Sequence, residues 1–119
     1  MSVSLVETQG NLMIGRCSGR LGYREWDQAQ RVLADEIRVR GRLRLLIRLD
    51  DFHGWEKGEQ WGDIGFFKAH DQDILAIAIV GEPRWRDEAL MFSFAGMRQA
   101  PVAYFTDEHE AHAWLATHS

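Results

Sequence analysis

The sequence lacks most of the features that mark specialised classes of protein. It holds one cysteine and two prolines, so neither a disulfide framework nor a proline-rich linker is expected. No stretch approaches the ~18 apolar residues of a membrane-spanning helix. The N-terminus has neither the basic start nor the apolar run of a signal peptide. These absences predict a soluble, cytoplasmic protein.

Positive charge is also scarce. The 14 Lys and Arg residues are outnumbered by 18 Asp and Glu, which gives a formal net charge of -4, and the basic residues form no cluster that could bind a phosphate backbone. The chain contains no nucleophile elbow, no phosphate-binding P-loop and no glycine-rich dinucleotide fingerprint. We therefore expect no nucleic-acid partner, no cofactor and no familiar class of enzyme.

Apolar and aromatic side chains are abundant. Hydrophobic residues make up 45% of the 119 positions, and five of them are tryptophan. A chain of this length can bury roughly two-thirds of its unfolded surface, and no linker divides it. We expect one domain over residues 1–119, with Cys17 as a small core residue and with Trp26 and Trp114 in the core.

Hydrophobic residues alternate along the chain with the period of a strand in some segments and of a helix in others. Strands are predicted over 2–7, Leu12–Leu21, 43–49, Ile74–Val80 and Val102–Phe105. Helices are predicted from Tyr23 to before Gly41 and over 56–70, 83–98 and 107–117. The order β-β-α-β-α-β-α-β-α begins with a hairpin at 9–11 and continues with parallel strands. It predicts an α/β fold with a mixed, mostly parallel five-stranded sheet.

Three short motifs in this order resemble the SpoIIAA-like family. They are Asp-Phe-His-Gly-Trp at 51–55, Ile-Ala-Ile-Val-Gly at 77–81 with Trp85 just beyond, and Ala-Trp-Leu at 113–115. The resemblance covers nearly the whole chain. It implies a small stand-alone bacterial domain related in fold to the STAS domains of anti-sigma factor antagonists. For such domains, binding of non-polar ligands or association with membranes has been proposed, and the resemblance implies no enzymatic activity.

The resemblance also implies a possible switch. In the antagonist proteins of this fold, a kinase partner phosphorylates a serine at the start of the helix after the third strand. Here no hydroxyl-bearing residue occurs from 50 to 70, so the serine switch does not carry over to this chain. Asp50 and Asp51 could imitate a phosphorylated serine. Acidic residues at the end of a strand are more typical of turns and helix caps.

Two groups of polar residues could carry chemistry. Asp51 and His53 follow the third strand, at the end where open α/β sheets hold their ligands, but their spacing is not that of a known metal site, so no metal is predicted. Glu108 and His112 share a face of the last helix at i and i+4. An acidic first turn, capped by Thr106 or Asp107, favours a solvated surface there.

The predicted helix over 83–98 is apolar on two opposite sides, which one sheet does not explain. One stripe, expected to face the sheet, holds Trp85, Ala89, Phe92 and Gly96. The opposite stripe holds Leu90, Phe94 and Met97, with Met91 and Ala95 on its flank. In the helix over 56–70, Phe66 likewise points away from Trp61, Ile64 and Phe67. Either these two helices cover each other, or their outer stripes meet a ligand, a membrane or another protein.

The sequence therefore predicts a non-enzymatic binding domain whose second and third helices frame a site for a small non-polar or lipid-like ligand, or dock on a membrane surface. The alternative is a protein-interaction module that forms a homodimer or binds a regulatory partner as anti-sigma antagonists do, without a serine switch. The predicted contact residues are Trp55, Trp61, Phe66, Trp85, Leu90, Met91, Phe94 and Met97, with Asp51 and His53 as polar candidates.

Overall fold

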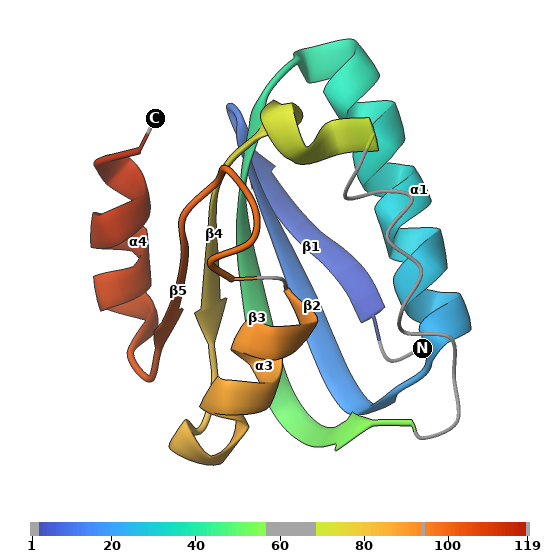
Figure 1. The fold of residues 1–119 in the computed structure, drawn as a ribbon, viewed down its shortest axis with the longest axis vertical. Coiled ribbons are helices and arrows are strands. Elements are labelled where there is room, and N and C mark those ends of the chain that lie inside the picture. Colours follow the sequence, from blue (N-terminus) through green and yellow to red (C-terminus); the bar gives the residue numbers. More distant parts are fainter. Residues whose placement is uncertain (1–2, 57–68, 94, 119) are drawn as a thin grey trace.

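The computed structural model describes residues 3–56, 69–93 and 95–118 and contains one sheet with helices on both faces (Figure 1). The five strands lie in chain order across the sheet. They are β1 (Val3–Gln9), β2 (Leu12–Leu21), β3 (Leu43–Trp55), β4 (Ile74–Val80) and β5 (Val102–Phe105). Strand β1 is antiparallel to β2, and each later pair is parallel. The predicted α/β fold with a mixed, mostly parallel sheet is confirmed.

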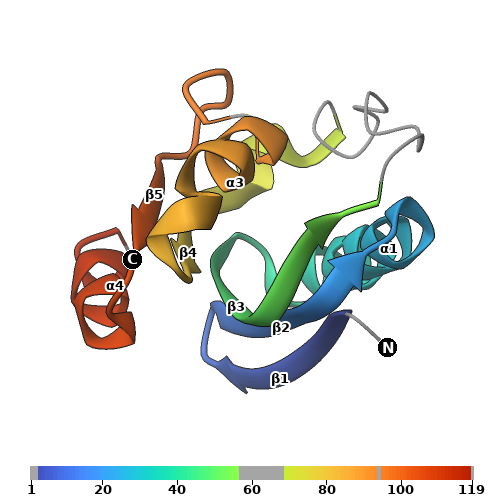
Figure 2. The same ribbon diagram turned by 90° about the horizontal axis from the view of Figure 1, so that it is seen from below.

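The helices form two unequal layers (Figure 2). Helices α1 (Tyr23–Arg40) and α3 (Arg86–Phe92) lie on one face of the sheet, and α4 (Glu108–Ala116) lies on the other. Short 3-10 turns, η1 (Asp71–Asp73) and η2 (Pro83–Trp85), precede β4 and α3. Most of the predicted helix over 56–70 lies outside the described residues. Among the described helices, none is both long enough and apolar enough to cross a bilayer.

Side-chain alternation along the strands produces two cores. In β3, Leu45 and Leu49 face α1 and α3, whereas Leu46 faces α4. The larger core comprises Met13, Cys17, Leu21, Ile37, Leu43, Leu45, Leu49, Phe52, Ile74, Ile77, Ile79, Trp85, Ala89 and Ala100. The smaller core comprises Leu12, Ile14, Leu46, Ala76, Ala78, Ala111 and Leu115. Because the sheet is apolar on both faces, strand β4 has the sequence of a continuous hydrophobic run.

The predicted helix over 83–98 is wrong in its second half, because α3 ends at Phe92. The Ser93 hydroxyl donates to the Leu90 carbonyl at 3.1 Å, and the Ala95 N–H donates to the same carbonyl at 3.0 Å, a bond that closes a helix C-terminus. Gly96 has a φ of +82°, a left-handed conformation that does not continue a helix. Gly96 is therefore exposed in a loop and does not pack on the sheet as predicted.

The predicted third strand, 43–49, is too short, because β3 continues through two bulges to Trp55. In this part of the sheet, β3 advances three residues for every two of β2. The paired residues are Cys17 with Leu49, Gly19 with Phe52, and Leu21 with Trp55. Each step contains one residue with positive φ, Asp51 at +50° and Gly54 at +99°. The prediction that Asp50 and Asp51 form a turn or a cap is wrong. An extra residue in each step instead keeps Leu49, Phe52 and Trp55 on one face of the sheet.

The first bulge is testable at Asp51, whose side chain is exposed and whose φ is +50°. Asp51→Val places a β-branched side chain in the left-handed region, so we expect the free energy of unfolding to fall by roughly 1–3 kcal/mol. Asp51→Gly is the control and should leave stability unchanged or slightly higher. Urea unfolding followed by tryptophan fluorescence measures both. A valine variant as stable as the original chain would contradict the bulge.

Candidate functional site

Four aromatic rings gather at the carboxyl end of β3, and we call them the aromatic cluster: Phe52, Trp55, Trp85 and Phe92. Phe52 meets Trp55 and Trp85 edge-on at centroid distances of 4.8 and 5.2 Å, and Trp55 stacks on Phe92 at 4.6 Å. These are favourable aromatic geometries. A Cβ at Gly54 would lie 3.3 Å from the Trp85 ring, so the glycine admits that ring. The aromatic cluster fastens η2 and α3 to the end of β3.

Helix α1 covers the sheet loosely. Of its 18 residues only Ile37 is buried, and Trp26 and Leu33 are half-buried although they point toward the larger core. Beneath them lies a space of about 430 Å³, which we call the α1 cavity. Its apolar lining includes Val3, Met13, Cys17, Trp26, Ala29, Val32, Leu33, Leu45, Ile47 and Ile77. Its polar lining includes Ser4, Arg16, Glu25, Gln28, Gln30, Ser93 and Arg98.

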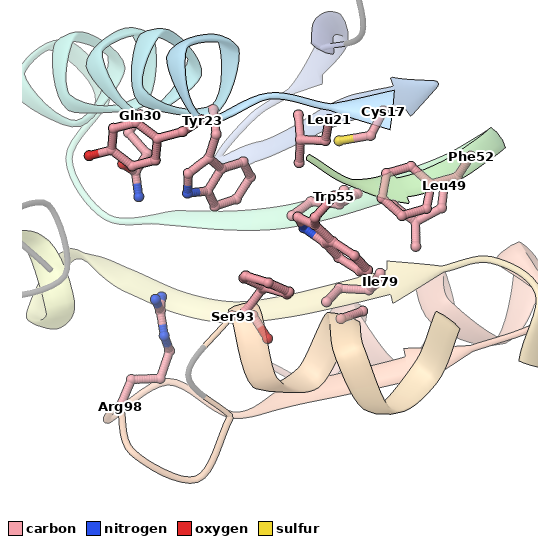
Figure 3. Close-up of a pocket in the computed structure, with 14 residues that line it drawn as sticks. Cys17, Leu21, Tyr23, Gln30, Leu49, Phe52, Trp55, Ile79, Ser93 and Arg98 are labelled. Carbon is pink, nitrogen blue, oxygen red and sulfur yellow. The ribbon is translucent and has the colours of Figure 1, made fainter. Parts of the chain in front are cut away.

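A narrower hollow of about 50 Å³ adjoins the α1 cavity and reaches the aromatic cluster (Figure 3). Phe52 and Trp55 line it at one end, and Tyr23 and Gln30 of α1 line it at the other. Phe92, which stacks on Trp55, also lines it. The residues that line both spaces are Cys17, Trp26, Gln30, Ile47, Ser93 and Arg98. The two spaces therefore form one site between α1, the sheet and α3.

Arg98 brings a positive charge to this site. Its side chain points from the loop after α3 into the space (Figure 3). Burial lowers the pKa of its guanidinium from the ordinary value, and the nearby carboxylate of Asp71 opposes that shift. An arginine side chain remains protonated under physiological conditions. The site is therefore mainly apolar, with a permanent cation at its edge.

Cys17 lies in the floor of the site. The residue is 3% exposed, and burial raises the pKa of its thiol to about 12, with a further contribution from the charge of Glu25. Because the thiolate is the nucleophile, Cys17 is not activated for catalysis. The predicted role as a small core residue is confirmed.

Comparison with known proteins agrees with this geometry. The model of the SpoIIAA-like family matches residues 13–116. The chain belongs to the SpoIIAA-like family. No curated protein sequence matches it.

Solved structures show the same fold at low sequence identity. An uncharacterized protein with a SpoIIAA-like fold from Shewanella loihica PV-4 aligns with a TM-score of 0.66 and 19% identity, covering 95% of this chain and 91% of that one. The unphosphorylated anti-sigma factor antagonist SpoIIAA aligns with a TM-score of 0.63 and 13% identity, covering 96% and 97%. The phosphorylated Bacillus cell fate determinant SpoIIAA aligns at 0.58 and 13%, covering 95% and 98%. The fold is thus related to that of anti-sigma factor antagonists.

The apolar residues predicted to meet a ligand are spread over this SpoIIAA-like domain. Trp55 lines the narrow hollow, whereas Trp85 is buried in the aromatic cluster behind it. Leu90 is half-buried. Met91 and Met97 are 64% and 75% exposed and line neither space. The other three predicted residues, Trp61, Phe66 and Phe94, lie outside the described residues.

The polar candidates of the SpoIIAA-like domain do not form a shared site. Asp51 and His53 are both exposed in the bulged part of β3, while Asp50 accepts a hydrogen bond from Arg16 at 3.0 Å. The described residues include no group of three or more His, Cys, Asp or Glu side chains placed to hold a metal ion.

The first turn of α4 is anchored to the sheet. Glu108 accepts two hydrogen bonds from Arg48 at 2.6 and 2.7 Å and lies 3.3 Å from His112. Arg48 is the main cause that lowers the pKa of Glu108. Asp107 caps the helix by accepting from the His109 N–H at 2.9 Å, which confirms one of the two predicted caps. The prediction of a wholly solvated face is too simple, because Glu108 is only half-exposed and paired.

Sequence reasoning missed the part of the SpoIIAA-like domain beneath α1. Trp26, Ala29 and Leu33 have the spacing of an ordinary sheet-facing stripe, and that spacing says nothing of how far a helix stands from its sheet. Arg98 falls at the end of the predicted helix over 83–98, whereas the end of α3 at Phe92 places it in a loop. Trp26 is half-buried at the cavity, and Trp114 packs beside Phe105 at 5.7 Å.

Proposed function

We propose that this SpoIIAA-like domain is a non-enzymatic binding domain that holds a small non-polar or lipid-like ligand in the α1 cavity. The observation that carries the proposal is the space of about 430 Å³ beneath α1. Ligand sites in proteins typically occupy roughly 300–1,000 Å³ and are lined by apolar side chains with a few polar groups. The lining of the α1 cavity has this character. The resemblance to the SpoIIAA-like family, for which binding of non-polar ligands has been proposed, points the same way.

The looseness of α1 supports this function. Protein interiors are close-packed, and side chains that face an empty space lose dispersion contacts. Trp26 and Leu33 remain half-buried above Met13, Cys17 and Leu45, which are buried in the sheet. An apolar ligand between these two layers would supply the missing contacts. Ligand binding would then complete the larger core.

The exposed methionines favour a second contact outside the cavity. Met91 and Met97 present flexible apolar side chains of the kind that adapt to varied surfaces. We propose that they dock the domain on a membrane surface. The second candidate function is a protein-interaction module that meets a second copy or a regulatory partner there, as the related fold of an anti-sigma factor antagonist suggests.

The cavity can be tested by filling it. We expect dodecanol and dodecanoic acid to shift the tryptophan emission of the unmodified chain and to raise its melting temperature, because a ligand at a hundredfold excess over Kd adds about 2.7 kcal/mol of stability. Ala29→Phe, which projects a ring into the α1 cavity, should abolish both responses. Melting temperature and fluorescence titration measure the effect.

Val39→Phe is the matched control, because Val39 lies on the same helix but is 83% exposed. This variant should respond to the ligands as the unmodified chain does. If the unmodified chain responds to none of the amphiphiles, ligand binding is excluded. A dimer found by light scattering under those conditions would then favour the interaction module.

A further inference from the structure

Two polar side chains of α1 line the site without a hydrogen-bond partner in the described part of the chain. Trp26 and Gln30 are four residues apart on α1, a spacing that places both on the same face of the helix. Both line the α1 cavity and the narrow hollow, and Gln30 points from α1 toward the sheet (Figure 3). Neither the indole N–H of Trp26 nor the carboxamide of Gln30 is bonded to another described residue.

These two side chains make a purely hydrocarbon ligand unfavourable. Trp26 and Gln30 are half-buried, so each remains in contact with water. A ligand that fills the site would remove that water. Because a polar group that leaves water without a new hydrogen bond costs free energy, a hydrocarbon would bind at a penalty. The favoured ligand therefore carries a polar group of its own beside Trp26 and Gln30.

The charged groups that line the site are already engaged within the chain. Arg16 donates to Asp50 at 3.0 Å. Arg98 and Glu25 each have an interaction partner in the chain, and the carboxylate of Asp71 acts electrostatically on Arg98. A charged head group would therefore meet no free opposite charge among the described residues of the lining, and it would lose its own hydration on entry. An uncharged head avoids this cost.

We propose, resting on the binding function above, that the ligand is an uncharged single-chain amphiphile with a hydroxyl head, and that Gln30 and Trp26 bind the hydroxyl. A hydroxyl both donates and accepts hydrogen bonds. The carboxamide oxygen of Gln30 accepts, whereas its NH₂ group and the Trp26 indole N–H donate, so the pair supplies both kinds of partner. The hydrocarbon chain lies beneath Leu33 in the α1 cavity, whose volume of about 430 Å³ is at the small end of the range for ligand sites.

The head group is tested with three ligands that share one chain, dodecanol, its methyl ether and dodecanoate. The ether keeps the oxygen but cannot donate a hydrogen bond. We expect the unmodified protein to bind dodecanol about two- to tenfold more tightly than the ether, which is the range for one net hydrogen bond between uncharged groups. Dodecanoate should bind more weakly than dodecanol. Titration of the tryptophan emission at neutral pH and fixed ionic strength, below the micelle concentrations, gives the three dissociation constants.

Variants on α1 assign the preference to these residues. Gln30→Leu should remove the preference for the alcohol over the ether, because leucine offers no acceptor. Trp26→Phe keeps a ring but removes the N–H donor, so it should weaken alcohol and ether by a similar factor. Gln72→Leu is the matched control, because Gln72 is an exposed glutamine that lines neither space. It should bind all three ligands as the unmodified chain does.

The outcomes separate this proposal from the binding function. If the ether binds as tightly as the alcohol, or if dodecanoate binds more tightly, the uncharged hydroxyl head is overturned and the binding function stands. A preference for the alcohol that survives in Gln30→Leu would overturn the role of Gln30. If no ligand binds, the binding function itself fails. Because the comparison of ligands uses the unmodified protein, the conclusions about the head group hold even if a variant fails to fold.

Discussion

Replacing Leu46 by alanine is expected to lower the free energy of unfolding by about 3–5 kcal/mol. Leu46 has no exposed surface and lies in the smaller core between the sheet and α4. Its neighbours there include Ala76, Ala78 and Ala111, whose short side chains cannot move into the vacated volume. A cavity that does not collapse places the substitution at the costly end of the leucine-to-alanine range.

Urea unfolding followed by circular dichroism measures this loss. Val39→Ala is the control, because Val39 is 83% exposed and a surface substitution of this kind changes stability by about 0.5 kcal/mol or less. A loss of less than about 1 kcal/mol for Leu46→Ala would contradict the packing of α4 on the sheet.

Replacing Trp85 by alanine should also cost about 3–5 kcal/mol, which is the range for truncating a buried aromatic residue. Trp85 is 8% exposed and contacts Phe52 and Trp55 edge-on at 5.2 and 6.1 Å. Its ring also covers Gly54. Without it, the aromatic cluster loses its centre and α3 loses its anchor to β3. Thermal and urea unfolding give the loss, and near-ultraviolet circular dichroism reports the disordered rings.

Trp85→Phe is the matched variant and should lose much less stability, because it keeps an aromatic ring against Gly54. The pair of variants also separates two roles for Trp85, a core residue and a ligand contact. If Trp85→Ala left stability unchanged and abolished the response to dodecanol, Trp85 would be a direct ligand contact and its assignment to the core would be wrong.

Much of the fold could be predicted because local pattern and tertiary structure agree in most elements. Strands Leu12–Leu21, Ile74–Val80 and Val102–Phe105 have the predicted bounds, since apolar runs bounded by turn residues leave little choice. The extension of β3 could not be predicted, because Asp, His and Gly after Leu49 are typical of a loop. The end of α3 was missed because apolar residues continue past Phe92 without any change in period.

The site could be predicted only in part. Trp55 and Trp85 were expected near a ligand region, and they do lie together in the aromatic cluster. The α1 cavity depends on the separation of a helix from a sheet, which no periodicity records. The position of Arg98 could not be predicted either, because it lies in a loop only as a result of the hydrogen bonds to the Leu90 carbonyl that end α3.

The two bulges of β3 show that the Asp-Phe-His-Gly-Trp motif determines the conformation of the backbone. Positions 51 and 54 have positive φ, and the aromatic side chains at 52 and 55 are the ones that these conformations turn inward. His53 faces solvent. The motif therefore specifies a backbone conformation, which Asn or Gly at position 51 would also adopt. Position 53 is free to vary. A search for relatives of this site should weigh the three-residue spacing above the identity of the acid or the histidine.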